Sequence, residues 1–145
     1  MGIDVLKEYA EALQERGYDI RHCDATSEEY IGEKFDTVVL GDVIEHVNNP
    51  VDLIRFAKRH LNPGGEIIAK TPNPYYFDAI KKCAKNRDFV SLDHLAWYTP
   101  TMALEISERA GCNLKAYILE NSEHPWYLRF MNPEIFSRDY IYIFE

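Results

Sequence analysis

The sequence predicts an α/β fold built around a mostly parallel sheet. Helix-like and strand-like patterns alternate along the first half of the chain, one strand-like run is almost entirely apolar, and the strand-like segments end in short polar stretches. Alternating strands and helices are typical of parallel strands joined by helical crossovers, and a uniformly apolar strand is typical of a sheet covered on both faces. In such folds ligands bind beyond the carboxyl ends of the strands.

The first half of the chain contains two helix-like segments. Residues 4–16 have the apolar period of an amphipathic helix that ends at Gly17, and a short strand is expected at residues 18–22. The run FDTVVL predicts a central strand covered on both faces. Asn49 and Pro50 are typical of an N-cap and a first helical turn, so a helix is expected from Pro50 to residue 61, followed by a strand at residues 66–70.

The second half of the chain has a different rhythm. A helix, an aromatic loop, a second helix that ends at Gly111 and two further strands are expected, in that order, at residues 75–86, 88–98, 100–110, 115–120 and 140–144. The two last strands are predicted to form an antiparallel hairpin at the edge of the sheet, with a long connection between them.

Composition restricts the classes of function. The chain has 145 residues and a net charge of −8, which disfavours a nucleic-acid partner because phosphate binding depends on Lys and Arg. No apolar run is long enough to cross a membrane, and no secretory signal is visible. The three cysteines have no C-x-x-C spacing, which favours reduced thiols and a cytoplasmic location.

Five segments in a fixed order carry a family resemblance: GID at Gly2, DA at Asp24, FDTVVLGDVIEHVNNP, LNPGGEIIAKTPNP and DHLAWYTPTMALEISERAGC. Together they resemble class I S-adenosylmethionine-dependent methyltransferases, especially the small-molecule branch related to ubiquinone-type O-methyltransferases. The resemblance implies a Rossmann-like sheet, S-adenosylmethionine as cofactor and a single domain with three parts. These are a cofactor side, an acceptor side and the C-terminal edge hairpin, at residues 1–73, 74–112 and 113–145.

The resemblance assigns cofactor contacts by position. Asp4 is expected to accept hydrogen bonds from the ribose hydroxyls, since a carboxylate offers several lone pairs to two adjacent donors. Asp24 and Ala25 would border the adenine. Three further residues would line the methionine end, where a glycine lets the backbone approach closely: Leu40, Gly41 and Asp42. Asp4 has an alternative role as the N-cap of the helix that follows it, and Asp24 has one as a capping residue of the turn that follows it.

One family feature is missing from the sequence. None of the seven glycines forms a G-x-G pair, and only three residues precede Asp4, the acid that ends the family's second strand, so the first strand and its glycine loop have no counterpart. We expect a fragment of a longer enzyme, with weak cofactor binding by this chain alone. The alternative is a sheet completed by a partner chain or a second copy, with a non-catalytic scaffolding role.

Asp42, Glu45 and His46 have the i, i+3, i+4 spacing that places side chains on one face of a helical turn. Two carboxylates and an imidazole suit a divalent ion, and His94 could supply a fourth ligand. Some relatives use a similar E-x-x-E-H pattern with a distant histidine for a metal. The alternatives are metal-free loop hydrogen bonds and a catalytic role for His46 or His94 as the general base that deprotonates the acceptor.

The acceptor is expected to be a small molecule. The resemblance implies methyl transfer to a hydroxyl group, and a sugar, a polyketide or a quinone-like compound fits the acidic chain better than nucleic acid does. Aromatic residues near the predicted site could cover the acceptor or belong to the core: Tyr75, Tyr76, Phe77, Trp97 and Tyr98.

Overall fold

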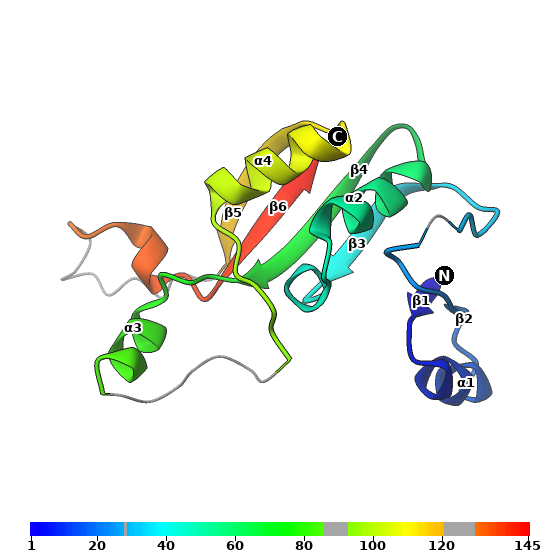
Figure 1. The fold of residues 1–145 in the computed structure, drawn as a ribbon, viewed down its shortest axis with the longest axis horizontal. Coiled ribbons are helices and arrows are strands. Elements are labelled where there is room, and N and C mark those ends of the chain that lie inside the picture. Colours follow the sequence, from blue (N-terminus) through cyan, green and yellow to red (C-terminus); the bar gives the residue numbers. More distant parts are fainter. Residues whose placement is uncertain (28, 86–92, 121–129) are drawn as a thin grey trace.

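The computed structural model describes residues 1–27, 29–85, 93–120 and 130–145, and arranges their strands in two sheets (Figure 1). The smaller sheet is a parallel pair of β1 (Gly2–Asp4) and β2 (Ile20–His22), joined by α1 (Lys7–Glu15). This N-terminal unit shares no strand pairing with the larger sheet among the described residues. The long segment between β2 and β3 connects the two.

The larger sheet has four strands in the order β3-β4-β6-β5. Its strands are β3 (Phe35–Gly41), β4 (Leu61–Pro72), β5 (Leu114–Glu120) and β6 (Asp139–Phe144). β3 and β4 are parallel, and β6 runs antiparallel to both β4 and β5. The predicted α/β fold with an antiparallel C-terminal hairpin is thereby confirmed. The remaining elements are η1 (Ile44–His46), α2 (Pro50–Arg59), α3 (Phe77–Cys83), α4 (Pro100–Ala110) and η3 (Pro133–Phe136).

The ends of the two longest helices follow from local chemistry. Asn49 is the N-cap of α2 and its side chain accepts a hydrogen bond from the backbone N–H of Val51, as the sequence predicts. Thr99 caps α4 in the same way. Gly111 ends α4 with φ 75°, a left-handed conformation that favours glycine.

Helices α2 and α4 lie side by side over one face of the larger sheet (Figure 1). Their apolar side chains and those of β4 and β6 form the core, which includes Ile54, Ile67, Ile106 and Phe144. The core also contains a buried hydrogen bond, which the Tyr142 hydroxyl donates to the Tyr98 carbonyl oxygen at 2.8 Å. No helix in the described part of the chain is long and apolar enough to span a bilayer.

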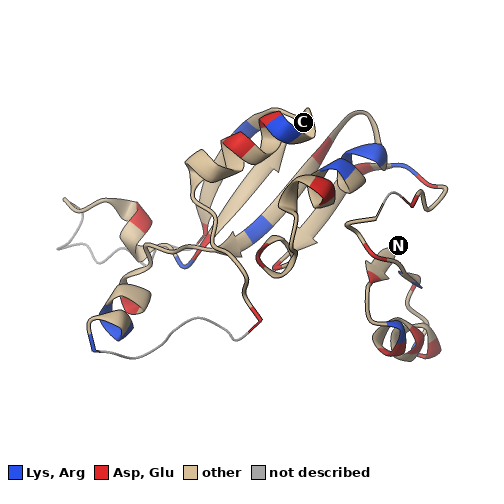
Figure 2. Ribbon diagram, viewed as in Figure 1, with Lys and Arg blue, Asp and Glu red and all other residues tan. Residues whose placement is uncertain are grey.

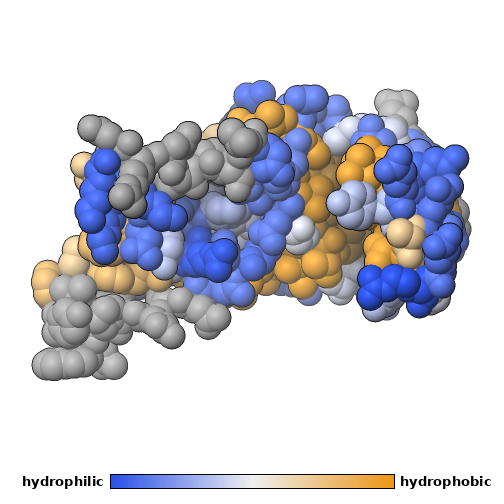
Figure 3. All heavy atoms as spheres, turned by 90° about the horizontal axis from the view of Figure 1, so that it is seen from below, coloured by the Kyte–Doolittle hydropathy of each residue, from blue (hydrophilic) through white to orange (hydrophobic). Residues whose placement is uncertain are grey.

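The prediction that FDTVVL is covered on both faces is wrong for the chain as described. β3 pairs only with β4, no described strand lies on its other edge, and Val39 is 67% exposed. Figure 3 shows an apolar surface in the middle of one face of the molecule, next to the N-terminal unit. β3 has the composition of a central strand but lies at an edge.

The predicted boundary after α2 also needs correction. The helix ends at Arg59, and Leu61 is the first residue of β4, where it pairs with Phe35. The Asn-Pro-Gly-Gly segment therefore lies within β4, as an irregularity between the pairing of Leu61 with Phe35 and that of Glu66 with Thr37. A Cβ at Gly65 would stand 2.8 Å from the Asp36 carbonyl oxygen, so this close approach of two strands requires glycine.

Candidate functional site

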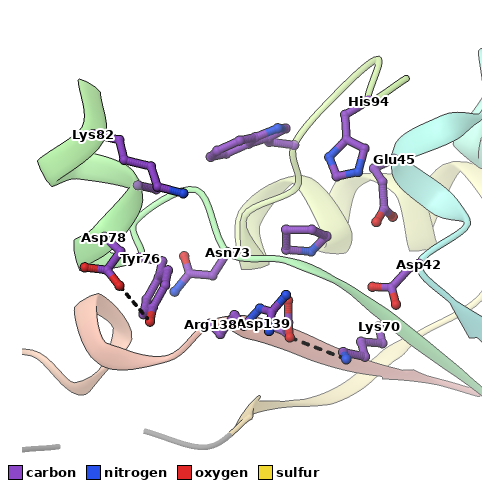
Figure 4. Close-up of a pocket in the computed structure, with 13 residues that line it drawn as sticks. Asp42, Glu45, Lys70, Asn73, Tyr76, Asp78, Lys82, His94, Arg138 and Asp139 are labelled. Carbon is purple, nitrogen blue, oxygen red and sulfur yellow. Dashed lines mark hydrogen bonds and ion pairs between the residues drawn. The ribbon is translucent and has the colours of Figure 1, made fainter. Parts of the chain in front are cut away.

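A pocket of about 550 Å³ lies beyond the carboxyl ends of β3 and β4, beside the first residue of β6 (Figure 4). In parallel α/β sheets this is the edge at which ligands bind. Charged and polar side chains dominate its lining, which consists of Asp42, Glu45, Lys70, Pro72, Asn73, Tyr76, Asp78, Ala79, Lys82, His94, Trp97, Arg138 and Asp139.

Three of the predicted metal ligands come together at one side of this pocket. Glu45, His46 and His94 each offer a ligand atom, and these atoms lie within 4.8 Å of one another. Asp42 lines the pocket but is not part of this group. Its backbone is left-handed, with φ 52°, and the helical turn begins only at Ile44, so the predicted i, i+3, i+4 face does not form.

Glu45 is almost completely buried, at 1% exposure. Its Oε2 accepts a hydrogen bond from the Thr71 hydroxyl at 3.1 Å, whereas its Oε1 is buried without a hydrogen-bond partner among the described residues. An unsatisfied buried carboxylate oxygen costs about 1–3 kcal/mol or more, and such atoms in native structures call for a functional explanation. The Oε1 atom is therefore a candidate ligand or proton-accepting atom.

The backbone of η1 holds the distant His94 beside Glu45 and His46. The carbonyl of Glu45 accepts a hydrogen bond from the Leu95 N–H at 2.8 Å, which fixes the loop that carries His94. The rings of His46 and His94 then meet edge to face, with centroids 4.7 Å apart. Sequence spacing alone could not show this contact, because 48 positions separate the two histidines.

The orientation of His46 follows from its neighbour. Its Nδ1 lies 3.1 Å from the Asp93 carbonyl oxygen and 3.5 Å from a carboxylate oxygen of the same residue. Because a carbonyl oxygen only accepts, Nδ1 carries the proton in the neutral ring, which leaves Nε2 unprotonated. A histidine held in this way can use Nε2 as a metal ligand or as a base.

The residues predicted to bind the cofactor lie at strand ends in both sheets. Asp4 is the last residue of β1, and its Oδ1 accepts from the Leu6 N–H at 2.7 Å. Asp24 follows β2, and hydrogen bonds from Thr26 to its Oδ1 lower its pKa. Asp24 thus caps the turn at Thr26 and Ser27, as the alternative predicted, whereas Leu6 and not Asp4 is the N-cap of α1. The hydrogen bonds use one oxygen of each carboxylate.

The other three predicted cofactor contacts differ in their accessibility. Ala25 is partly buried against the core of the larger sheet. Leu40 is a buried core residue, so only its backbone is available at the site. Gly41 faces open space, since no atom lies within 4 Å of the position that a Cβ would take.

Sequence reasoning missed a charged cluster in the pocket wall. Lys70, at the end of β4, forms ion pairs with Glu120 at 3.1 Å and with Asp139 at 3.4 Å. The hydrogen bond that Lys70 donates to Glu120 raises the Lys70 pKa and lowers the pKa of Glu120. Burial, followed by the hydrogen bond with Glu120, raises the pKa of Asp139. The only signal in the sequence is a Lys at the end of an apolar strand.

The predicted aromatic cover is present only in part. Tyr76 and Trp97 line the pocket, whereas Tyr98 is buried in the core. Tyr75 and Phe77 are about half exposed and do not line the pocket.

This architecture defines a class of α/β proteins with a ligand pocket at the carboxyl edge of a Rossmann-like sheet. The chain belongs to the methyltransferase domain family, whose model matches residues 3–117. The predicted family is thereby confirmed.

Curated relatives match part of the chain. A ubiquinone biosynthesis O-methyltransferase of Pseudoalteromonas translucida is 26% identical over 111 residues, which is 70% of this chain and 47% of the relative. A protein of the same name from Caulobacter vibrioides is 37% identical over 71 residues, 47% of this chain and 28% of the relative. The chain thus spans half or less of the length of these relatives.

Solved structures share the fold over almost the whole chain. An S-adenosylmethionine-dependent methyltransferase from Thermotoga maritima superposes with a TM-score of 0.71 at 17% identity, over 99% of this chain and 70% of its own. Magnesium protoporphyrin IX methyltransferase from Synechocystis, solved with bound S-adenosylhomocysteine, gives a TM-score of 0.63 at 14% identity, over 99% of this chain and 62% of its own.

Proposed function

We propose that this chain is an S-adenosylmethionine-dependent methyltransferase domain that transfers a methyl group to a hydroxyl of a small molecule. The observation that carries the proposal is the pocket beyond β3 and β4 in a methyltransferase domain, lined by the buried Glu45 and by His94, with His46 beside them. The relatives named for ubiquinone biosynthesis favour an oxygen acceptor.

The chain's residues fit this cofactor. Asp4 and Asp24 each keep a second carboxylate oxygen without a hydrogen bond among the described residues, and these can accept from the ribose and the adenine amine. Gly41 leaves its backbone open on the methionine side. When bound, the cofactor supplies a methyl group on a positively charged sulfur, which is already an activated leaving group. We expect weak binding by this chain alone, because its sequence has no G-x-G loop.

The protein's task is then to orient the acceptor and to take up its proton. His46 Nε2 accepts the hydroxyl proton, while the Asp93 carbonyl oxygen holds the Nδ1 proton in place. The deprotonated acceptor oxygen would then take the methyl group that the cofactor supplies, and the cofactor would leave as the neutral thioether. His94, in edge contact with His46, is the alternative base.

The pocket favours a polar acceptor. Seven of its thirteen lining residues are charged, which suits a sugar or another hydroxylated polar compound better than an extended apolar one. Figure 2 shows acidic and basic residues interspersed over the described elements, and with a net charge of −8 this argues against nucleic acid. Three free cysteines support a cytoplasmic location.

A metal-dependent form of the same reaction is the second candidate. One carboxylate and two imidazoles are a common catalytic zinc set, and the unpartnered Glu45 Oε1 supplies the anionic ligand. Glu45, His46 and His94 would hold the ion, which would polarise the acceptor oxygen and lower its pKa. Asp42 stands outside this set.

A non-catalytic scaffolding role is the alternative from another class. Among the described residues no strand pairs with the outer edges of β1 and β3, and these edges with the exposed Val39 favour an additional strand from a partner chain or a second copy. Size-exclusion chromatography with light scattering distinguishes the cases, because a stable monomer without cofactor affinity contradicts both roles.

Calorimetric titration with S-adenosylhomocysteine, followed by transfer of labelled methyl groups to a panel of catechols and sugars, tests the enzymatic proposal. We expect binding that Asp4→Asn and Asp24→Asn weaken, and transfer that His46→Ala reduces by about 10²–10⁴-fold, the usual contribution of a general base. Unchanged transfer in His46→Ala, with and without EDTA, would contradict the assigned roles. Glu108→Gln, on the exposed face of α4, is the control.

A further inference from the structure

His60 is a buried titratable residue that the proposed mechanism does not use. It follows the last turn of α2 and is only 2% exposed. Its ring stacks on Tyr30, with centroids 5.0 Å apart, and contacts Phe56 at 4.4 Å. A histidine enclosed in this way, far from the pocket beyond β3 and β4, requires its own explanation.

Both ring nitrogens of His60 have a partner, and the two partners have different chemistry. Nδ1 lies 2.8 Å from the Phe56 carbonyl oxygen, which only accepts, so Nδ1 carries the proton. Nε2 accepts a hydrogen bond from the Ile31 backbone N–H at 3.1 Å. Only the neutral ring with this tautomer can satisfy both, because an imidazolium has no acceptor.

The segment that His60 binds is the connection between the two sheets. Residues 23–34 lead from β2 to β3, and they begin with the predicted adenine-binding Asp24 and Ala25. A second contact comes from Arg59, whose guanidinium donates to the Ser27 carbonyl at 2.6 Å. The end of α2 thus holds this segment at two points, before and after residue 28.

These attachments matter because the smaller sheet has no strand pairing with the larger one among the described residues. Asp4 ends β1 and Asp24 lies two residues after β2, whereas Gly41 is the last residue of β3 in the larger sheet and Asp42 follows it. The connecting segment therefore sets the separation of the two groups that the proposed cofactor must contact at once.

We infer that His60 is a positioning residue that fixes the adenine side of the cofactor site against the end of α2. The consequence for the cofactor rests on the function proposed above, whereas the anchoring of residues 23–34 does not. A loss of the anchor lets Asp24 and Asp4 move relative to Gly41, and cofactor affinity falls while the groups beside His46 stay in place.

Two substitutions at this position separate the hydrogen bond from the packing. His60→Phe keeps a ring against Tyr30 and Phe56 but removes the acceptor for the Ile31 N–H. His60→Gln loses the ring but restores an acceptor oxygen of similar reach. Amide hydrogen exchange of the full chain reports on the Ile31 N–H, and the amides of β4 and β6 report on global stability.

We expect His60→Phe to accelerate amide exchange at Ile31 by about tenfold, which is the effect of one lost hydrogen bond. The amide exchange rates in β4 and β6 should not change. His60→Gln restores at least part of this protection. Calorimetry with S-adenosylhomocysteine should show a matching rise in the dissociation constant for His60→Phe and a smaller one for His60→Gln.

Unchanged exchange at Ile31 in His60→Phe overturns the inference, and so does equal acceleration in both variants or throughout β4 and β6. If the parent chain binds no S-adenosylhomocysteine at all, the proposed function fails, and the exchange experiment still decides whether His60 anchors the segment. The two failures are therefore distinguishable.

Discussion

Replacing Glu45 by Gln should stabilise the fold and weaken a divalent-ion site formed with His46 and His94. The carboxylate is 1% exposed, and its Oε2 receives one hydrogen bond from the neutral Thr71 hydroxyl. Its Oε1 receives none among the described residues. The amide keeps the shape and the bond from Thr71, and it replaces a poorly solvated charge by a neutral group.

The magnitude follows from that comparison. A buried unsatisfied neutral group costs about 1–3 kcal/mol, and a charged one costs more. Replacing Glu45 by Gln should therefore raise the free energy of unfolding in EDTA by about 1 kcal/mol, a small gain because the buried amide nitrogen of Gln would still lack a partner. For a chain of this size, the melting temperature should rise by about 2–4 °C.

Added Zn²⁺ should reverse the order of stability. An ion at 100 times its dissociation constant stabilises the folded state by about 2.7 kcal/mol, which the parent chain gains and the Gln variant largely loses. Differential scanning calorimetry with EDTA and with Zn²⁺ measures both effects, with Glu108→Gln as the control. A lower melting temperature for Glu45→Gln in EDTA would refute the reasoning about the buried charge. An equal Zn²⁺ shift in both proteins would refute the metal site.

Two further predictions concern the core and the charged wall of the pocket. Tyr142→Phe should lower the free energy of unfolding by about 1–3 kcal/mol, because the Tyr98 carbonyl is left buried without its donor. Urea unfolding should show a lower midpoint with an unchanged slope. An unchanged midpoint would contradict a stabilising role for this hydrogen bond. Lys70→Met should lower the free energy of unfolding at pH 7 by about 1 kcal/mol, because the buried Asp139 loses its cation, which is itself partly exposed. Without the cation the Asp139 pKa rises further above its ordinary value. The difference in the free energy of unfolding between the parent chain and Lys70→Met therefore shrinks as the pH falls toward about 4. Urea unfolding of both proteins at pH 7 and at pH 4.5 measures this difference.

Local chemistry made much of the fold predictable. Asn49 and Thr99 cap their helices through their own side chains, and Gly111 ends α4 because it tolerates a positive φ. Such signals act over three or four residues and are visible in the sequence. The antiparallel hairpin of β5 and β6 followed from two short apolar runs, and its pairing is confirmed.

Features that depend on register or on backbone conformation were not predictable. The cluster around Lys70 forms because Glu120 and Asp139 are directly opposite in the β5–β6 ladder, a pairing fixed by the whole hairpin. Asp42 leaves the expected ligand group because its φ of 52° breaks the helical period assumed for the segment. His94 was predicted as a ligand from the family resemblance, but the backbone hydrogen bond between Leu95 and Glu45 that brings it there is not visible in any side-chain pattern.

The two halves of the candidate site are therefore held by different forces. Glu45 and His46 rest on a core and a strand register that many residues share, so single substitutions there change chemistry more than geometry. Asp4 and Asp24 depend on a connecting segment with few attachments, of which His60 supplies one. Substitutions at Glu45 or His46 should thus act mainly on the rate of methyl transfer, whereas His60→Phe should act mainly on cofactor affinity. Equal effects on both quantities would mean that the two halves move as one body.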